Sequence, residues 1–226
     1  NHQTGARSKD MTPISDRAGR IGLTAAALII SSALLRLNLG LVSGPNSAIT
    51  LSHTLTYALA AASMYALLLA VTVFYVGARQ ALGALGLVGY LTVSLGTVLV
   101  AGDCWFEAFA VPTIGAHAPD VLALRPAGSV LAGAMIGGAL FASGWITFAV
   151  AVFRSGAFSR PAAVLVIIGG GCGALALSTP YQVPLAIGIG WAGYTLLRAA
   201  AHRPASARTE QPVSFVAGGL PVRHPR

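Results

Sequence analysis

Three acidic residues lie in one short segment of this chain: Asp103, Glu107 and Asp120, with His117 between the last two. Asp103 and Glu107 are four residues apart, so they share one face if the segment is helical. Carboxyl groups at a shared site can give and take protons in general acid and base catalysis. In a catalytic interpretation Glu107 or Asp103 is therefore the proton donor.

Arg36 is the basic residue most closely associated with these acids. It lies within an apolar run, about six residues or roughly 9 Å before the end of that run. An arginine at this depth in a membrane is costly unless it is paired or its side chain reaches the interface. We therefore predict an ion pair with Asp103 or Glu107. In a ligand pocket the same guanidinium would hold an anion.

The other candidate ligand-binding residues are His53, which opens the second apolar run, Trp105 and His117. Four interpretations of this polar group remain open: a structural ion pair with Trp105 as an interfacial anchor, a ligand pocket, a metal site, and a proton or ion path. A metal site would use His53, Asp103, Glu107 and His117. Because these four have no compact metal-ligand spacing, we expect no metal.

Composition places the chain in a membrane. It has 226 residues, of which 55% are hydrophobic and 9% are charged, and its mean hydropathy is +0.75. A soluble domain carries roughly 25% charged residues. The net charge of +8 could indicate nucleic-acid binding, but the basic residues flank apolar runs. Such flanks are typical of membrane topology and of contact with lipid headgroups, so we expect no nucleic-acid partner.

Six continuous apolar runs predict an all-α transmembrane bundle. Membrane β-strands alternate and need only about 9–11 residues, whereas these runs are longer and do not alternate. They cover residues 21–42, 53–76, 81–101, 127–152, 161–178 and 184–198. We expect residues 1–20 to be a basic N-terminal tail, residues 21–198 to be the six-helix transmembrane domain, and residues 199–226 to be a disordered basic tail.

The distribution of basic residues predicts the orientation. With the N-terminus in the cytoplasm, 12 of the 14 Lys and Arg residues lie in cytoplasmic segments and only Arg125 lies in an outer loop. The 12 are Arg7, Lys9, Arg17, Arg20, Arg79, Arg154, Arg160, Arg198, Arg203, Arg208, Arg223 and Arg226. Cytoplasmic loops are enriched in Lys and Arg. We therefore expect both termini to be cytoplasmic in a multi-pass protein of the plasma membrane.

Glycine spacing indicates close helix packing, and the sequence offers no clear set of cofactor ligands. The pairs Gly133–Gly137 and Gly169–Gly173 have GxxxG spacing, which favours tight packing within the bundle or at a dimer face. Retinal is excluded because no lysine lies within an apolar run, and His53 and His117 are poorly placed for haem. Cys104 and Cys172 form no metal or disulfide pattern. The sequence therefore names no cofactor.

The segment Trp105-Phe106-Glu107-Ala108-Phe109, followed by Val111-Pro112 and Ala116-His117-Ala118-Pro119, is distinctive. It resembles a WFEAF-x-VP…AHAP pattern of small multi-pass membrane proteins of actinobacteria. The resemblance implies a six-helix integral membrane protein of unassigned activity. Those proteins often carry His-Pro near the end of the first span, where this chain has Ser43-Gly44-Pro45.

These patterns predict a binding or accessory membrane protein with a polar pocket at the outer face. One alternative is an intramembrane enzyme that acts on a lipid or isoprenoid by acid and base chemistry. A second alternative is a small transporter. The expected partners are membrane lipids, a lipid or small-molecule ligand, and another membrane protein.

Overall fold

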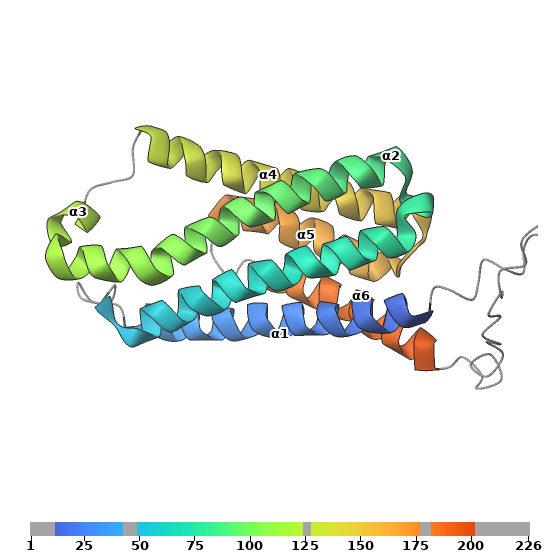
Figure 1. Cartoon of the computed structure of the whole chain (residues 1–226), viewed down its shortest axis with the longest axis horizontal. Coiled ribbons are helices and arrows are strands. Elements are labelled where there is room, and N and C mark those ends of the chain that lie inside the picture. The colour runs from blue at the N-terminus through green and yellow to red at the C-terminus, as the bar shows by residue number, and fades with distance from the viewer. Residues whose placement is uncertain (1–11, 43–48, 124–127, 177–181, 202–226) are drawn as a thin grey trace, which may run out of the picture.

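The computed structural model describes residues 12–42, 49–123, 128–176 and 182–201, and within these ranges it is helical without strands. The helices are α1 (Thr12–Val42), α2 (Leu51–His117), α3 (Pro119–Ala123), α4 (Gly128–Ser155), α5 (Arg160–Ala176) and α6 (Val183–Ala201). The predicted all-α bundle is therefore confirmed for the described part of the chain. Figure 1 shows the long helices α1, α2, α4, α5 and α6 side by side along the length of the bundle.

The longest helix, α2, is a hairpin of two arms. Its backbone breaks at Gly83, where φ is 60° and ψ is −156°, a combination that essentially only glycine adopts. The first arm, residues 51–82, runs one way, and the second arm, residues 84–117, returns beside it (Figure 1). The sequence predicted this turn at residues 77–80, but those residues are helical. The bundle thus contains six long helical segments.

The helices pack as a closed ring. Helix α1 lies between α6 and α2, α4 lies between α2 and α5, and α5 lies against α6 (Figure 1). The first arm of α2 faces α1, where Phe74 approaches Gly22. The second arm faces α4. The largest fully buried side chains, Trp145 and Phe141 of α4, fill the interior of this ring.

Glycines set the closest approach between the second arm of α2 and α4. A Cβ atom on Gly89 would lie 2.6 Å from the backbone nitrogen of Phe148. Gly96 is equally crowded by the backbone at Phe141, and Gly144 by the backbone at Val93. Small residues let two helix backbones approach in this way. These two helices therefore meet backbone to backbone between residues 89 and 96 of α2 and between residues 141 and 148 of α4.

The predicted GxxxG glycines lie in different environments. Gly137 is buried against Leu99, but nothing lies within 4 Å of a Cβ built on Gly133. Gly169 packs on the backbone of Leu185 in α6. The first pair thus gives only one packing contact within the bundle.

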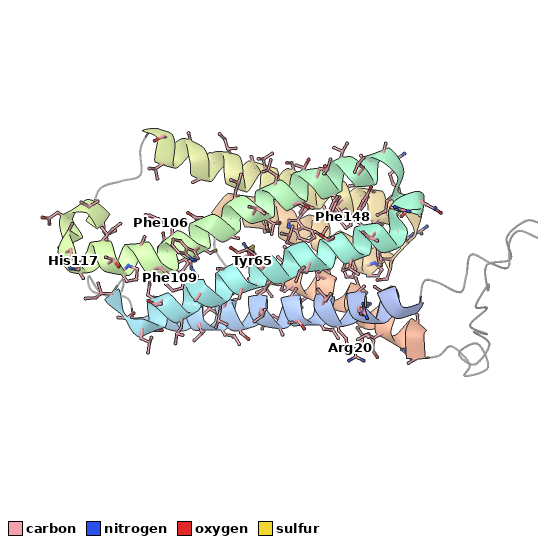
Figure 2. The ribbon with its side chains drawn as sticks, in the orientation of Figure 1. Arg20, Tyr65, Phe106, Phe109, His117 and Phe148 are labelled. Atoms are coloured by element: carbon pink, nitrogen blue, oxygen red, sulfur yellow. The ribbon has the colours of Figure 1, made fainter. Side chains whose placement is uncertain are left out.

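Six arginines lie at one end of the bundle, together with Asp16 of α1, and three acidic residues lie at the other end, together with Arg36. The basic end is formed by the start of α1, the bend of α2, the junction of α4 and α5, and the end of α6 (Figure 1). It carries Arg17, Arg20, Arg79, Arg154, Arg160 and Arg198. The acidic end, where α1 ends and both arms of α2 terminate, carries Asp103, Glu107 and Asp120. Figure 2 shows Arg20 and His117 at these opposite ends.

Three of the described helices are long and apolar enough to cross a membrane, over Arg17–Leu37, Leu51–His117 and Gly128–Ser155. The helix over Arg160–Cys172 is apolar but shorter. Large apolar side chains cover the outside of the bundle, among them Leu34, Leu69, Leu91 and Val130. An outer surface of this kind fits a membrane protein, because lipid takes the place of water around it.

Several predicted boundaries differ from those observed. Helix α1 begins at Thr12, so part of the predicted basic tail is helical. The predicted loop after residue 101 is helical to His117, despite Pro112 within it. Helix α6 extends to Ala201. Residues 1–11 and 202–226, together with Arg125, lie outside the described residues.

Candidate functional site

Polar side chains from three helical segments meet at the acidic end. His53 lies in the first turn of α2, whose start is capped because the hydroxyl oxygen of Thr50 accepts a hydrogen bond from the His53 backbone nitrogen at 3.2 Å. The His53 ring reaches across to the second arm. Its Nε2 lies 3.0 Å from the carbonyl oxygen of Glu107 and 3.6 Å from Glu107 Oε2. This contact ties together the two arms of α2.

Arg36 joins this group from α1. Its guanidinium carbon lies 5.1 Å from the centre of the Tyr57 ring, which is within the range of a cation–π contact. Tyr57 also contacts His53, with ring centroids 4.6 Å apart. We call Arg36, His53, Tyr57, Asp103 and Glu107 the polar cluster.

The carboxyl groups of the polar cluster lie within the range of electrostatic interaction with Arg36. The charge of Arg36 acts on both Asp103 and Glu107. The predicted direct ion pair is nevertheless absent among the described residues, since no Arg36 nitrogen lies within 4.0 Å of a carboxylate oxygen. The guanidinium lies over Tyr57 instead. Opposite charges therefore face the same region without neutralising each other by contact.

Accessibility differs between the members of the polar cluster. The side chain of His53 is 12% exposed and that of Glu107 is 34% exposed. Asp103 is exposed and Arg36 is half-buried. The two carboxyl groups and the guanidinium can thus be reached by a molecule at the surface of the bundle.

The structure separates Trp105 and His117 from the polar cluster. Trp105 is 54% exposed and contacts Phe109, with ring centroids 5.4 Å apart, on another face of the helix. The Nδ1 of His117 lies 3.0 Å from the carbonyl oxygen of Thr113 in its own helix. Figure 2 shows His117 near the tip of the bundle, beyond Phe106 and Phe109. Of the six predicted site residues, four come together and these two do not.

Tyr57 was missed as a site residue, because a tyrosine near a helix end is usually an interfacial aromatic residue. The spacing between Tyr57 and His53 contained the information that could have identified it. Residues four apart lie on the same face of a helix, so Tyr57 had to accompany His53 toward any shared site.

Possible metal ligands and two cysteine thiols occur in the described part of the chain. Among the described residues, no group of three or more His, Cys, Asp and Glu side chains is placed to hold a metal ion. Both cysteines are free thiols. Cys104, which follows Asp103 in the sequence, is buried, and Cys172 is half-buried. The polar cluster itself contains charged groups and hydrogen-bonding groups.

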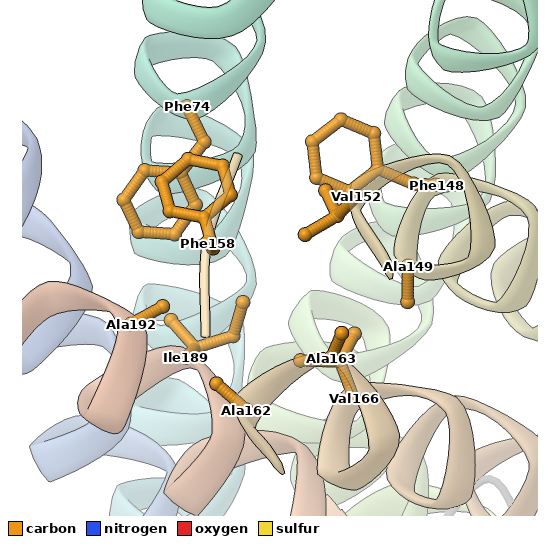
Figure 3. Close-up of a pocket in the computed structure, with 10 residues that line it drawn as sticks. All are labelled: Phe74, Phe148, Ala149, Val152, Phe158, Ala162, Ala163, Val166, Ile189 and Ala192. Atoms are coloured by element: carbon orange, nitrogen blue, oxygen red, sulfur yellow. The ribbon is translucent and has the colours of Figure 1, made fainter. Parts of the chain in front are cut away.

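A small apolar cavity lies toward the other end of the bundle. Its volume is about 20 Å³, roughly the space of one water molecule. Figure 3 shows its lining, contributed by α2, α4, α5, α6 and the turn between α4 and α5, with the rings of Phe74 and Phe158 close together. Their centroids are 5.2 Å apart. Neither Asp103 nor Glu107 is among the residues that line this cavity.

Comparison of the chain with protein-family models, with curated proteins and with solved structures finds no match. The resemblance to the actinobacterial membrane proteins stays a prediction from the sequence motif.

Proposed function

We propose that this chain is a multi-pass protein of the plasma membrane that crosses the bilayer six times, with both termini in the cytoplasm. The separation of charge along the bundle supports this proposal. Basic residues are retained on the cytoplasmic side of membrane proteins, and the basic end carries six described arginines. The basic end is then cytoplasmic, and the acidic end faces outward.

The length of the second arm of α2 supports the same arrangement. Asp103 follows Gly83 by 20 residues, which is about 30 Å along a helix and matches the hydrocarbon thickness of a bilayer. Glu107 lies one turn further. With the bend at the inner boundary, the polar cluster lies at the outer boundary, where charged groups meet headgroups and water.

We further propose that the protein has a binding or accessory role, exercised through the polar cluster. The observation that carries this proposal is the convergence of one cation, two carboxyl groups and two polar rings from α1 and both arms of α2. Ionisable residues inside membrane-spanning segments are costly and mark functional sites by default, and Arg36 lies within the first predicted span. Here they remain accessible and only partly paired, as a binding site requires.

The intramembrane enzyme is the second candidate function. An acid that protonates a lipid or isoprenoid needs an apolar cavity for the substrate beside it. The cavity described above lies away from Asp103 and Glu107.

The transporter has less support. The hydroxyls of Ser32, Ser63 and Thr72 donate hydrogen bonds to carbonyl groups of their own helices. Ser32 and Ser63 therefore serve the helices in which they lie, while Thr72 also lies 3.4 Å from the Tyr90 hydroxyl of the second arm.

Glu107→Gln tests the binding role. The purified full chain in detergent is screened by thermal shift against phospholipids, isoprenoids, small anions and divalent ions. We expect at least one class to raise the melting temperature of the wild type by several degrees, and Glu107→Gln to abolish that rise. Asp120→Asn, an exposed acid in α3, is the matched control and should retain it. Equal responses of the two variants would contradict a binding site centred on Glu107.

A further inference from the structure

We propose that the ligand of the polar cluster is a zwitterionic phospholipid headgroup that carries a phosphate and a primary ammonium group. This inference rests on the binding role proposed above and names its ligand class. Arg36 would hold the phosphate, and Asp103 with Glu107 would hold the ammonium group. The juxtaposition of unneutralised opposite charges at one accessible site carries the inference.

The phosphate half of the site is Arg36. Its guanidinium is oriented by the Tyr57 ring, and none of its nitrogens lies within 4.0 Å of a described carboxylate. A guanidinium presents five N–H donors in a rigid fork that matches phosphate oxygens. Stacking on an aromatic ring leaves the edge of this fork available. Arg36 is therefore prepared for an anion that this part of the chain does not supply.

The ammonium half of the site is the face shared by Asp103 and Glu107. The two residues are one helical turn apart, Asp103 is exposed, and one Glu107 oxygen lies 3.6 Å from His53. The carboxylates accept hydrogen bonds and have no donors of their own when ionised. A primary ammonium group supplies three donors and one positive charge, which complements both acids.

The two halves together exclude simpler ligands. A purely anionic headgroup would meet Arg36 but would be repelled by two carboxylates. A purely cationic ligand would meet the carboxylates but would be repelled by Arg36. Arg36 contacts the Tyr57 ring, Tyr57 contacts His53, and His53 lies 3.6 Å from a Glu107 oxygen, so the two halves of the site adjoin each other. A molecule that carries both charges gains a favourable electrostatic contact at each half of the site.

Exposed aromatic side chains favour a lipid over a free zwitterion. Going around the second arm of α2, Phe106 lies between the Asp103–Glu107 face and the Trp105–Phe109 pair. Phe106 and Phe109 are each 49% exposed and Trp105 is 54% exposed. Such rings at the membrane boundary contact lipid next to the headgroups. Acyl chains below a headgroup at the polar cluster would lie against this aromatic face.

The test compares three probes on the full chain in detergent: dihexanoyl phosphatidylethanolamine, dihexanoyl phosphatidylglycerol and soluble glycerophosphoethanolamine. Binding is followed by native mass spectrometry and thermal shift. We expect the wild type to bind phosphatidylethanolamine about tenfold more tightly than phosphatidylglycerol, the gain expected of one charge-assisted contact. Glycerophosphoethanolamine should bind more weakly than the lipid.

Asp103→Asn should remove the preference for phosphatidylethanolamine while binding of phosphatidylglycerol is kept or improved. The control Asp120→Asn should behave as the wild type. Equal affinities of the wild type for the two lipids, or identical behaviour of the two variants, would overturn the inference. Tighter binding of glycerophosphoethanolamine than of the lipid would contradict the proposal that the headgroup belongs to a lipid. Binding of another class of ligand that depends on Glu107 would overturn the proposed phospholipid ligand, but it would leave the proposed binding role intact.

Discussion

At the scale of single residues, His53 is the side chain that connects the two arms of α2 at the acidic end. Its contact with the Glu107 carbonyl is 3.0 Å long, and its ring also packs on Tyr57. His117 has a hydrogen bond of the same length, but only within its own helix. The two histidines therefore form a natural comparison.

We expect His53→Ala to destabilise the protein by about 1 kcal/mol, the net contribution of a partly buried hydrogen bond. His117→Ala should have a smaller effect, because its partner is four residues away on an exposed helix end. Thermal unfolding of both variants in the same detergent measures the difference. If both lower the melting temperature equally, His53 does not act as the connection between the arms.

We also expect Arg36→Leu to lower the yield and melting temperature of the folded protein. The substitution removes the cation–π contact with Tyr57, worth about 0.5–2 kcal/mol depending on desolvation, and leaves Asp103 and Glu107 without a nearby cation. Tyr57→Leu should reproduce the loss of the contact, whereas Tyr57→Phe should largely keep it. An Arg36→Leu variant that melts at the wild-type temperature would show that Arg36 contributes nothing to folding.

The sequence could indicate which residues of the polar cluster come together, but not how they pair. Spacing placed Asp103 and Glu107 on one face, and topology placed Arg36 and His53 at the same end. The partner of Arg36 is Tyr57 because an aromatic ring can compete with a carboxylate for a guanidinium. That choice depends on the relative rotation of α1 and α2, which hydrophobic patterns along a lipid-facing helix leave poorly defined.

At the scale of helices, glycines decide which surfaces approach most closely. Gly96 faces the backbone of α4 at Phe141, whereas Gly133 faces open space. Both are glycines within apolar helices, and Gly133 even belongs to a GxxxG pair. Their difference is a property of the packed bundle.

We expect Gly96→Ala to destabilise the bundle by about 1–3 kcal/mol, as overpacking does in a tight interior. Gly133→Ala should be neutral or slightly stabilising, because alanine has the higher helix propensity and nothing is crowded. Thermal unfolding of the two variants provides the measurement. A neutral Gly96→Ala would mean that α2 and α4 have room to separate.

The apolar runs predicted which segments form helices, but they predicted the residues at which the helices end less accurately. The turn between the arms of α2 was expected at the polar residues 77–80, but the chain bends at Gly83, where the backbone needs a conformation that other residues avoid. Ser159 directly before Arg160 and Pro161 is a sequence pattern typical of a helix N-cap, yet its hydroxyl is buried without a partner among the described residues. Thr50, which does cap α2, gave no comparably clear signal.

At the scale of the whole molecule, charge separation along the bundle is the basis for both the orientation and the proposed binding site. The basic end gathers arginines from α1, α2, α4, α5 and α6, and the acidic end gathers the described carboxyl groups of α2 and α3. Between the ends the outer surface is apolar. A bilayer around this middle region would leave the polar cluster at the outer boundary.

The most direct measurement is the sidedness of the two ends in intact cells. In a background of Cys104→Ser and Cys172→Ser, the exposed residues Asp120 in α3 and Gln80 near the bend of α2 are replaced singly by cysteine. We expect a membrane-impermeant maleimide to label Asp120→Cys in intact cells and Gln80→Cys only after permeabilisation. Labelling of both from the same side, or the reverse pattern, would contradict the account.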